Sequence, residues 1–493
     1  MGLRVRPFSS FAEPVSRKVP QGMGLRGPDH ADRGTSFAPA PGDAVSRLLC
    51  RRACGGGAVP ARPRILSHRA QGGGGMNLLF LSNLYPPNTV GGYERLCFEV
   101  ASALAGRNHR VSVLTSDYGG RIEDYLGQEV DRSLRLLADD RDIYRPFSAS
   151  NEERHRIARR NAELLRGALE RLKPEVLFVW NLFFFDRSLL DTVQEARCGK
   201  VFLLTDNWLI SFLRPRFWQT YFDEKVLASP SFARRIRNAV FGLAGRGRSD
   251  RHAIRIRGRA VFPSRFMERL YRQAGFTFQG TAVVPHGVHL KRRPDSDYRD
   301  RTFPVEKGRL RLLFAGRVVE MKGVHTILEA LPEILKGVPD ADVRLTILGD
   351  TRDIRYLERL QGTIRERGLS ERVDFRPPVR EPDLFRVFQE HDIYLFPSLY
   401  EPFSLTLIHA LESGIPTVAS DVGGNREIVF HGKTGLLFEK GRAPGLARAV
   451  LELAGSPGLR REVSREARRT ARELTFDAMV RRIERRLEEG RCG

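Results

Sequence analysis

An alternation of short apolar runs with helical segments begins at residue 76 and constrains the fold more than any other feature of the chain. The run NLLFLS (77–82) has the apolar character of a buried parallel strand, and RVSVLTS (110–116) is the next strand candidate. A helix with one apolar face is expected between them, over about residues 94–107. Because strands that alternate with helices form parallel sheets, residues 76–295 are expected to fold as a doubly wound α/β domain.

The same alternation restarts near residue 309 and predicts a second Rossmann-like domain over residues 296–465. Its strand candidates are RLRLLFAGR (309–317), VRLTILGD (343–350), RVDFRPPV (372–379), DIYLFPS (392–398) and PTVASD (416–421). Residues 466–493 are expected to form a C-terminal helix, for which packing back on the first domain is one alternative. The predicted fold class is α/β, with two Rossmann-like domains that face each other across a cleft.

The first 75 residues differ in composition from the rest of the chain. They are rich in Gly, Pro, Arg and Ser, and they contain 12 Lys and Arg residues against 4 Asp and Glu residues. A segment with so little apolar content cannot bury enough surface to offset the entropy of ordering. We interpret residues 1–75 as a disordered extension upstream of a start at Met76; an Arg-rich organellar presequence is the alternative.

The composition indicates which kinds of partner and which cellular compartment to expect. The net charge of +23 favours anionic partners such as phosphorylated substrates or lipid headgroups, although a general arginine bias explains it equally well. No recognisable nucleic-acid-binding motif is present, so no specific nucleic-acid partner is predicted. No run approaches the roughly 18–20 apolar residues that span a bilayer, and the five cysteines form no CxxC pair. These observations predict a cytoplasmic protein without a cysteine-bound metal.

A loop at the end of the strand that begins at residue 309 has the composition of an anion site. It reads GRVVEMKG (316–323), so Gly316 allows close backbone approach, and Arg317 and Lys322 flank the start of a helix. A guanidinium and an ammonium beside a helix N-terminus suit a diphosphate. The spacing matches neither a Walker loop nor a GxGxxG fingerprint, and two solvated loop charges are the alternative interpretation.

A second turn is expected at the same edge of this sheet. After DIYLFPS the chain turns at residues 400–402, and the next helix is expected to start near Ser404. Glu401 would project from the turn into the cleft, where a carboxylate can accept two hydrogen bonds from a sugar diol. His409 stands eight residues later on the helix and could face either the cleft or the core.

Taken together, these pieces resemble the family-4 retaining glycosyltransferases of the GT-B fold, over the chain from Met76 onward. The similar segments are GGYER (91–95), VVPHGV (283–288), LLFAGRVVEMKG (312–323) and LFPSLYEPFSLTLIHALESGIPTVASDVGGNREIV (395–429). The resemblance implies a retaining transfer of a hexose from a nucleotide-diphosphate sugar to a saccharide, lipid-linked or other hydroxyl acceptor. It implies no metal ion and no cofactor.

The resemblance also implies roles for individual residues. Arg317 and Lys322 would bind the donor diphosphate and stabilise the charge of the leaving group, and Glu401 would contact the donor sugar. Backbone amides near the start of the helix would meet phosphate; these belong to Phe403, Ser404 and Leu405. Ser404 stands where the family usually has glycine.

In the first domain, the resemblance implies that the backbone at Gly91 and Gly92 approaches the donor, with Glu94 and Arg95 as secondary candidates. Asp206 could orient the acceptor hydroxyl; capping of the following helix is its structural alternative. The departing β-phosphate would take the acceptor's proton, and catalysis would rest on positioning and charge stabilisation.

Two departures from the family pattern leave a second function open. His409 stands where a glutamate is expected to hold the ribose hydroxyls, although Glu412 one turn later is a substitute. Thr205 and Asn181 stand at positions where the family tends to have a histidine. A non-catalytic nucleotide- or sugar-binding protein of the same fold is therefore the alternative.

Two further segments have two interpretations each. The aromatic stretch over residues 208–222 predicts a packed helix and loop, or a site for an apolar acceptor. The run of nine arginines from Arg234 to Arg259 is typical of a solvated loop; the alternative is peripheral docking on anionic membrane at its inner face.

Overall fold

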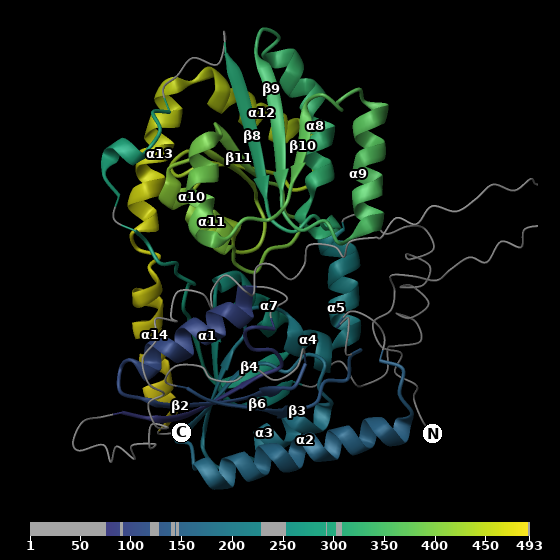
Figure 1. The fold of residues 1–493 in the computed structure, drawn as a ribbon, viewed down its shortest axis with the longest axis vertical. Helices are drawn as coiled ribbons and strands as arrows, with labels where there is room; N and C mark the ends of the chain where they lie inside the picture. The colour runs from purple at the N-terminus through teal and green to yellow at the C-terminus, as the bar shows by residue number, and fades with distance from the viewer. Residues whose placement is uncertain are drawn as a thin grey trace, which may run out of the picture. The chain divides into compact units, whose positions relative to one another are not determined.

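The computed structural model describes residues 75–88, 92–118, 128–139, 143, 147–227, 253–291, 293–301 and 308–491 (Figure 1). Residues 75–493 form one unit, which is described here, and residues 1–74 lie outside it. The predicted disorder of the N-terminal extension therefore lies outside the described residues, as does Gly91.

The first sheet contains seven parallel strands in the order β3-β2-β1-β4-β5-β6-β7. Two of the predicted strands, 77–82 and 110–116, are present with those bounds as β1 and β2. The bounds are β1 (Asn77–Ser82), β2 (Arg110–Ser116), β3 (Glu129–Leu134), β4 (Val176–Asn181), β5 (Gly199–Leu203), β6 (Ile254–Phe262) and β7 (Phe276–Val283).

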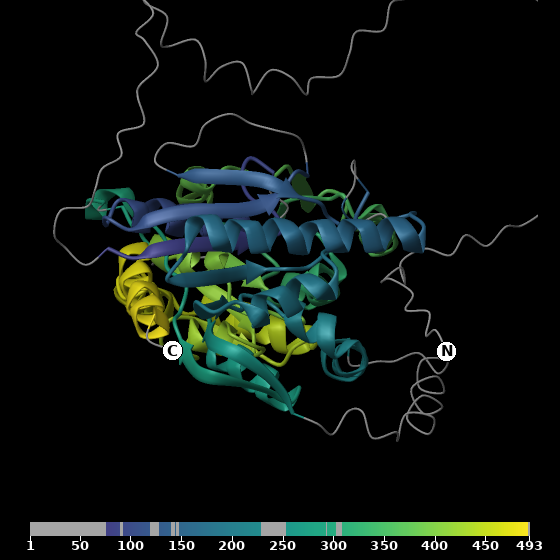
Figure 2. The same ribbon diagram turned by 90° about the horizontal axis from the view of Figure 1, so that it is seen from below.

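The helices of the first domain lie on both faces of this sheet, and Figure 2 shows the long α2 running along one of them beside α3. The predicted helix over 94–107 begins two residues earlier, at Gly92. The elements are α1 (Gly92–Ala105), α2 (Asn151–Leu172), α3 (Arg187–Glu195), α4 (Trp208–Leu213), α5 (Pro215–Tyr221), the π-helical turn η1 (Phe222–Val226) and α7 (Arg265–Gln273).

The end of the arginine run corrects the solvated-loop interpretation. Residues 228–252 lie outside the described residues, but β6 begins at Ile254 and pairs with β5 and β7. Along this strand Arg255 and Arg257 are exposed, whereas Ile256 between them is buried. Alternation with a period of two places the arginines on one face and the apolar side chains on the other, so this part of the run is a strand.

The second sheet contains six parallel strands in the order β10-β9-β8-β11-β12-β13. Its strands are β8 (Arg309–Ala315), β9 (Asp342–Leu348), β10 (Val373–Arg376), β11 (Ile393–Phe396), β12 (Thr417–Ser420) and β13 (Leu436–Phe438). Its helices and 3₁₀ turns are η3 (Asp295–Asp297), η4 (Glu320–Lys322), α8 (Val324–Gly337), α9 (Ile354–Glu366), α10 (Glu381–Glu390), α11 (Leu405–Ser413), η5 (Asn425–Glu427), α12 (Ala443–Gly455) and α13 (Pro457–Ala471).

Each sheet has an apolar core on both faces. In β1, Leu79 packs with α2 and α3, whereas its neighbours Leu78 and Phe80 pack with α1 on the other face. In β8, Leu312 and Leu313 divide between two cores in the same way. Burial on both faces explains why these strands appear in the sequence as continuous apolar runs. Two parallel sheets, each between layers of helices, confirm the predicted fold class.

The last helix, α14 (Phe476–Arg491), packs on the first sheet, against β4, β5 and β6. Its buried face includes Ile483 and Leu487, which lie in the same core as β1. A Cβ added to Gly199 at the start of β5 would lie 2.1 Å from the carbonyl oxygen of Gly490. Only glycine therefore allows this close approach of the helix end to the sheet.

The chain thus passes between the two sheets twice, once after β7 and once between α13 and α14. The two connections lie side by side, because Val288 and Thr475 form an isolated parallel bridge. The amide of Val288 donates to Leu474 O at 3.1 Å, and the amide of Phe476 donates to Val288 O at 2.9 Å. A Cβ on Gly287 would lie 2.1 Å from the carbonyl oxygen of Thr475, so the crossing is tightly packed.

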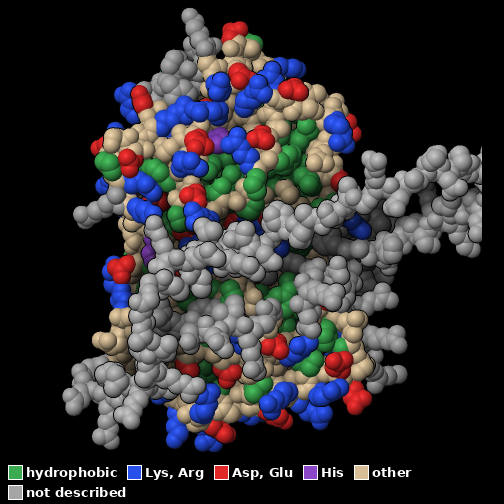
Figure 3. Space-filling view, viewed as in Figure 1, with side chains coloured by type: hydrophobic (Ala, Val, Ile, Leu, Met, Phe, Trp, Pro, Cys, Tyr) green, Lys and Arg blue, Asp and Glu red, His purple; other side chains and the backbone are tan. Residues whose placement is uncertain are grey.

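The surface mixes charges of both signs. On the face shown in Figure 3, Lys and Arg side chains are interspersed with Asp and Glu side chains. None of the helices among the described residues combines the length and the apolar character that crossing a bilayer requires.

Candidate functional site

The basic loop after β8 is fastened to the loop after β9. The amide of Gly316 donates to Leu348 O at 2.9 Å, and the amide of Val318 donates to Asp350 O at 2.8 Å. Gly323 ends the loop with φ +69°, and a Cβ there would lie 2.2 Å from the carbonyl oxygen of Pro397. Glycine is therefore required where this loop meets the end of β11 and α8 begins.

The two basic side chains of this loop differ in their surroundings. Arg317 is exposed, and within the described residues no hydrogen bond or ion pair holds its guanidinium. Lys322 is largely buried, with 19% of its side chain exposed, and its Nζ lies 2.5 Å from Oε2 of Glu401. The loop therefore presents one free cation and one cation that is already bound to a carboxylate.

The turn that carries Glu401 is buried and closely packed. Glu401 is 6% exposed, and Ser398 Oγ lies 3.5 Å from its Oε2. The amide of Gly424 donates to the carbonyl oxygen of Glu401 at 2.9 Å, and a Cβ on Gly423 would lie 2.0 Å from that oxygen. The loop after β12 therefore supports the backbone of the Glu401 turn, while Lys322 and Ser398 contact its carboxylate.

The helix after this turn begins where the sequence predicts. Ser404 is the N-cap of α11, and its Oγ accepts a hydrogen bond from Leu407 N at 3.2 Å. Phe403 is buried, and its ring makes an edge contact with the ring of His286 at 5.5 Å. A Cβ on Gly92 would lie 3.8 Å from Leu405 Cδ1, so the N-terminus of α1 faces that of α11. Two helix N-termini, with their free amides, therefore meet at this place.

His409 lies behind this point on α11, where it is 9% exposed. Its Nε2 is 3.3 Å from a carboxylate oxygen of Glu381, and its Nδ1 is 3.4 Å from one of Glu412. Burial opposes the charged form, but hydrogen bonds to both carboxylates raise the pKa of His409 to about 9. Both ring nitrogens therefore donate to carboxylates, and the predicted contact of His409 with a ligand stays a prediction.

Glu381 links this histidine to the first domain. Its other carboxylate oxygen lies 2.9 Å from Arg95 on α1, and Arg95 is also paired with Glu99 at 2.8 Å. The hydrogen bond from His409 is the main cause of the lowered pKa of Glu381. Sequence patterns gave no signal for Glu381, because an acid in the first turn of a helix is common for electrostatic reasons alone.

Asp206 follows β5 and accepts a hydrogen bond from Trp208 N at 2.8 Å at the start of α4. Burial raises the pKa of Asp206 to about 6; the hydrogen bond from Trp208 opposes this rise and the charge of the buried Glu94 adds to it. The neighbouring Tyr93 donates its hydroxyl to Asn83 Oδ1 at 2.8 Å. Asp206 therefore acts as a cap, and it also belongs to a buried acidic cluster near the N-terminus of α1.

The parallel sheets, the two crossings and the basic loop opposite a helix N-terminus define a two-domain fold of the GT-B class. Residues 298–470 match the family described as glycosyl transferases group 1, and residues 90–292 match glycosyltransferase family 4. The chain belongs to glycosyltransferase family 4.

Two groups of relatives differ in how much of the chain they match. A D-inositol 3-phosphate glycosyltransferase from Pseudarthrobacter chlorophenolicus is 35% identical over 167 residues, which is 34% of this chain and 40% of the relative. The chain thus spans less than half the length of this relative. A glycogen synthase from Mycobacterium tuberculosis is 26% identical over 410 residues, which cover 82% of this chain and 91% of that protein.

Solved structures show the same fold. Sucrose-phosphate synthase from Thermosynechococcus elongatus matches with a TM-score of 0.62 at 19% sequence identity. The match covers 84% of this chain and 98% of that protein's chain. Anabaena Alr3699/HepE in complex with UDP and glucose matches with a TM-score of 0.57 at 20% sequence identity. The match covers 84% of this chain and 100% of that protein's chain.

Proposed function

We propose that this protein transfers a sugar, with retention, from a nucleotide-diphosphate sugar to a hydroxyl group of a saccharide or lipid-linked acceptor. The observation that carries the proposal is the ion pair of Lys322 and Glu401 at 2.5 Å, beside the N-terminus of α11. The ammonium of Lys322 can bind phosphate, and the carboxylate of Glu401 can bind sugar hydroxyls. The two groups thus lie together, as the junction between the sugar and the diphosphate of a donor requires.

The chemistry follows from these groups. As the bond between the sugar's anomeric carbon and the diphosphate oxygen breaks, negative charge develops on the diphosphate. Lys322, Arg317 and the amides of α11 would stabilise that charge. The acceptor oxygen forms the new bond to the anomeric carbon on the same face, and its proton passes to the departing phosphate oxygen. Glu401 would hold the sugar hydroxyls, and no metal ion or cofactor takes part.

Asp206 is the proposed positioning group for the acceptor hydroxyl. With a pKa of about 6 it is ionised at neutral pH, and a carboxylate can accept a hydrogen bond from the attacking hydroxyl. Its cap on α4 fixes the direction of the carboxylate.

The relatives support a nucleotide-sugar donor. The Anabaena protein is described in complexes with UDP, with UDP-glucose, and with UDP and glucose. The other relatives are a glycogen synthase and glycosyltransferases that act on D-inositol 3-phosphate.

The second candidate function is non-catalytic binding of a nucleotide or sugar. It is favoured by His409, because a histidine with both nitrogens bound to carboxylates offers no free acceptor for a ribose diol. Direct measurement of donor turnover separates the two candidates.

The test is thermal unfolding of the full chain with UDP, GDP, ADP, CMP and their sugar conjugates, without added metal. A ligand at 100 times its dissociation constant stabilises the folded state by about 2.7 kcal/mol, so the shift is measurable. We expect a shift with one nucleotide diphosphate that is lost in Arg317→Ala and kept in Arg461→Ala, a matched exposed arginine on α13.

The outcomes lead to different conclusions. A shift together with release of the nucleotide diphosphate in the presence of acceptors supports the transferase. A shift without any turnover of donor supports the binding protein. Absence of a shift across the whole panel contradicts the transferase and favours a binding protein that does not take nucleotide sugars.

A further inference from the structure

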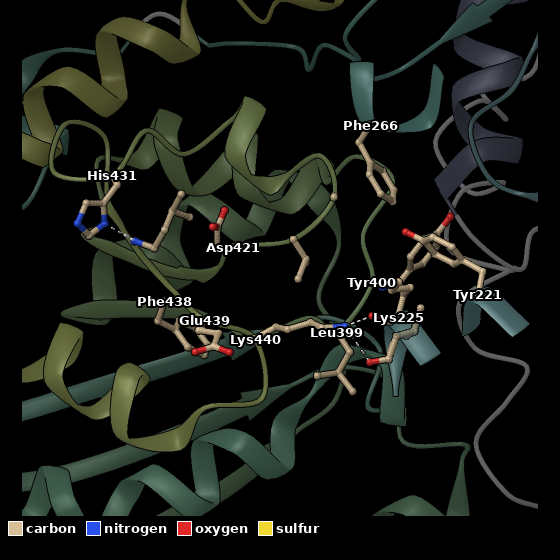
Figure 4. A pocket seen from close by; sticks show the side chains of 14 residues that line it. Tyr221, Lys225, Phe266, Leu399, Tyr400, Asp421, His431, Phe438, Glu439 and Lys440 are labelled. Atoms are coloured by element: carbon tan, nitrogen blue, oxygen red, sulfur yellow. Dashed lines mark hydrogen bonds between the residues drawn. The ribbon is translucent and has the colours of Figure 1, made fainter. Parts of the chain in front are cut away.

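A cavity lies beside the Glu401 turn, between the two domains. Its volume is about 550 Å³, and Figure 4 shows its lining side chains. The first domain supplies side chains from α5 to η1 and Phe266 of α7, and the second domain supplies the rest from the turn after β11, the loop after β12, and β13 with the segments on either side of it. Neither Arg317 nor Lys322 lines it. The cavity is therefore separate from the donor groups named above, and its volume falls within the range of small-molecule sites.

One wall of the cavity is aromatic and held rigid. Tyr400 makes edge contacts with Phe266 at 5.8 Å and with the buried Trp218 at 5.3 Å. Trp218 in turn stacks on Tyr221 at 5.9 Å. Tyr221, Phe266 and Tyr400 are thus each supported by another ring. A preformed aromatic surface can cover the C–H face of a sugar ring at little cost in side-chain entropy.

The opposite wall carries polar groups that are fixed in direction. His431 Nδ1 accepts a hydrogen bond from Leu437 N at 3.0 Å, which leaves its Nε2 to carry the proton as a donor. Asp421 is held by Arg426 at 2.8 Å through one carboxylate oxygen. Glu439 is exposed at the rim. One held carboxylate, one carboxylate at the rim and a ring donor match the hydroxyl groups of a saccharide.

The charged side chains that line the cavity balance, because Lys225 and Lys440 stand against Asp421 and Glu439. The ammonium of Lys440 donates to the backbone carbonyl oxygens of Lys225 and Val226, at 3.1 Å in the second case. Burial lowers the pKa of Lys440. Two of its three N–H donors are thus used within the protein, and a lining whose charges balance suits a neutral ligand better than an anion.

The cavity is next to the place where the transferred sugar would lie. Leu399 and Tyr400 line it, and the following residue is Glu401. Gly423 also lines it and packs on the carbonyl oxygen of Glu401. An acceptor that enters from this side would place its non-reacting part in the cavity while its hydroxyl group reaches the donor.

We infer that this cavity binds a neutral oligosaccharide, as the site for the part of the acceptor that does not react. The role of the cavity as an acceptor site rests on the proposed transferase function. Binding of a saccharide to the cavity can be tested without any transfer reaction.

The test measures binding of maltotriose, mannotriose, galactotriose, cellotriose and chitotriose to the full chain. Tryptophan fluorescence serves as the readout, because Trp218 contacts both Tyr400 and Tyr221. We expect at least one trisaccharide to bind. Tyr221→Leu and Phe266→Leu should each weaken it about tenfold, the loss expected for one aromatic contact. Phe385→Leu on α10, which also removes one partly buried ring, is the control and should leave the affinity unchanged.

A second variant covers the case in which Tyr221→Leu disturbs the fold. Glu439→Gln changes an exposed side chain, 75% accessible, and should weaken saccharide binding without a change in unfolding temperature. The inference is overturned if no trisaccharide binds, if Phe385→Leu weakens binding as much as Tyr221→Leu, or if inorganic phosphate displaces the saccharide. Saccharide binding without any nucleotide-induced shift would refute the transferase and leave this cavity a saccharide site. Nucleotide binding without saccharide binding would refute the cavity assignment alone.

Discussion

His409 is expected to stabilise the folded protein only while it is protonated. Its ring bridges Glu381 and Glu412, and its pKa in the folded state is about 9 against an ordinary value of 6.5. A folded-state pKa that lies above the unfolded value adds stability that is complete below pH 6.5 and is lost as the pH rises through 9.

The size of this contribution follows from the difference between the folded-state and the ordinary pKa of His409. A difference between 6.5 and about 9 corresponds to about 3 kcal/mol in the free energy of unfolding. The contribution is also lost in acid, because Glu381, whose pKa is lowered mainly by its hydrogen bond from His409, must keep its charge. The maximum effect is therefore expected between the lowered pKa of Glu381 and pH 6.5.

The assay is urea unfolding of the wild type and His409→Gln from pH 6 to pH 10. The difference in free energy of unfolding should be about 3 kcal/mol at pH 6 and should shrink towards pH 10. His155→Gln, which changes an exposed histidine on α2, should give a difference that is constant over this range. Parallel stability curves for the wild type and His409→Gln would refute a protonated bridge.

Two further variants test the site. Gly323→Ala should destabilise the protein by about 1–3 kcal/mol in urea unfolding, because φ is +69° and the new Cβ would lie 2.2 Å from Pro397 O; wild-type stability would contradict the required glycine. Asp206→Asn keeps an oxygen that can cap α4 but removes the titrating group. Wild-type transfer should fall as the pH drops below about 6, and the same acid limb in the variant would rule out a positioning carboxylate at Asp206.

Most of the strands that could be predicted from sequence are largely buried, although the partly exposed β10 was predicted as well. β1 and β11 are nearly continuous apolar runs, and no other element explains such runs as well. β3 and β6 were missed, because both alternate charged and apolar residues. In β6 that alternation was hidden within a longer run of arginines.

The features of the candidate site likewise fall into those that could be predicted from sequence and those that could not. Lys322 and Glu401 could be proposed from local patterns, because each stands in a loop directly after a strand. Their ion pair could not, since 79 residues separate them. Glu381 was missed for the same reason: its bonds to His409 and Arg95 depend on how α10 packs against α11 and α1.

The pair of connections between the sheets limits the motion that the chain permits. A single connecting strand would let one domain swivel about each of its backbone bonds. Here two strands cross together and are hydrogen-bonded through Val288, so swivelling would break the bonds to Leu474 and Phe476. Bending across the paired strands keeps those bonds and is the softer direction. Each opening and closing of the two domains would then follow the same arc and return the same loops to the same positions.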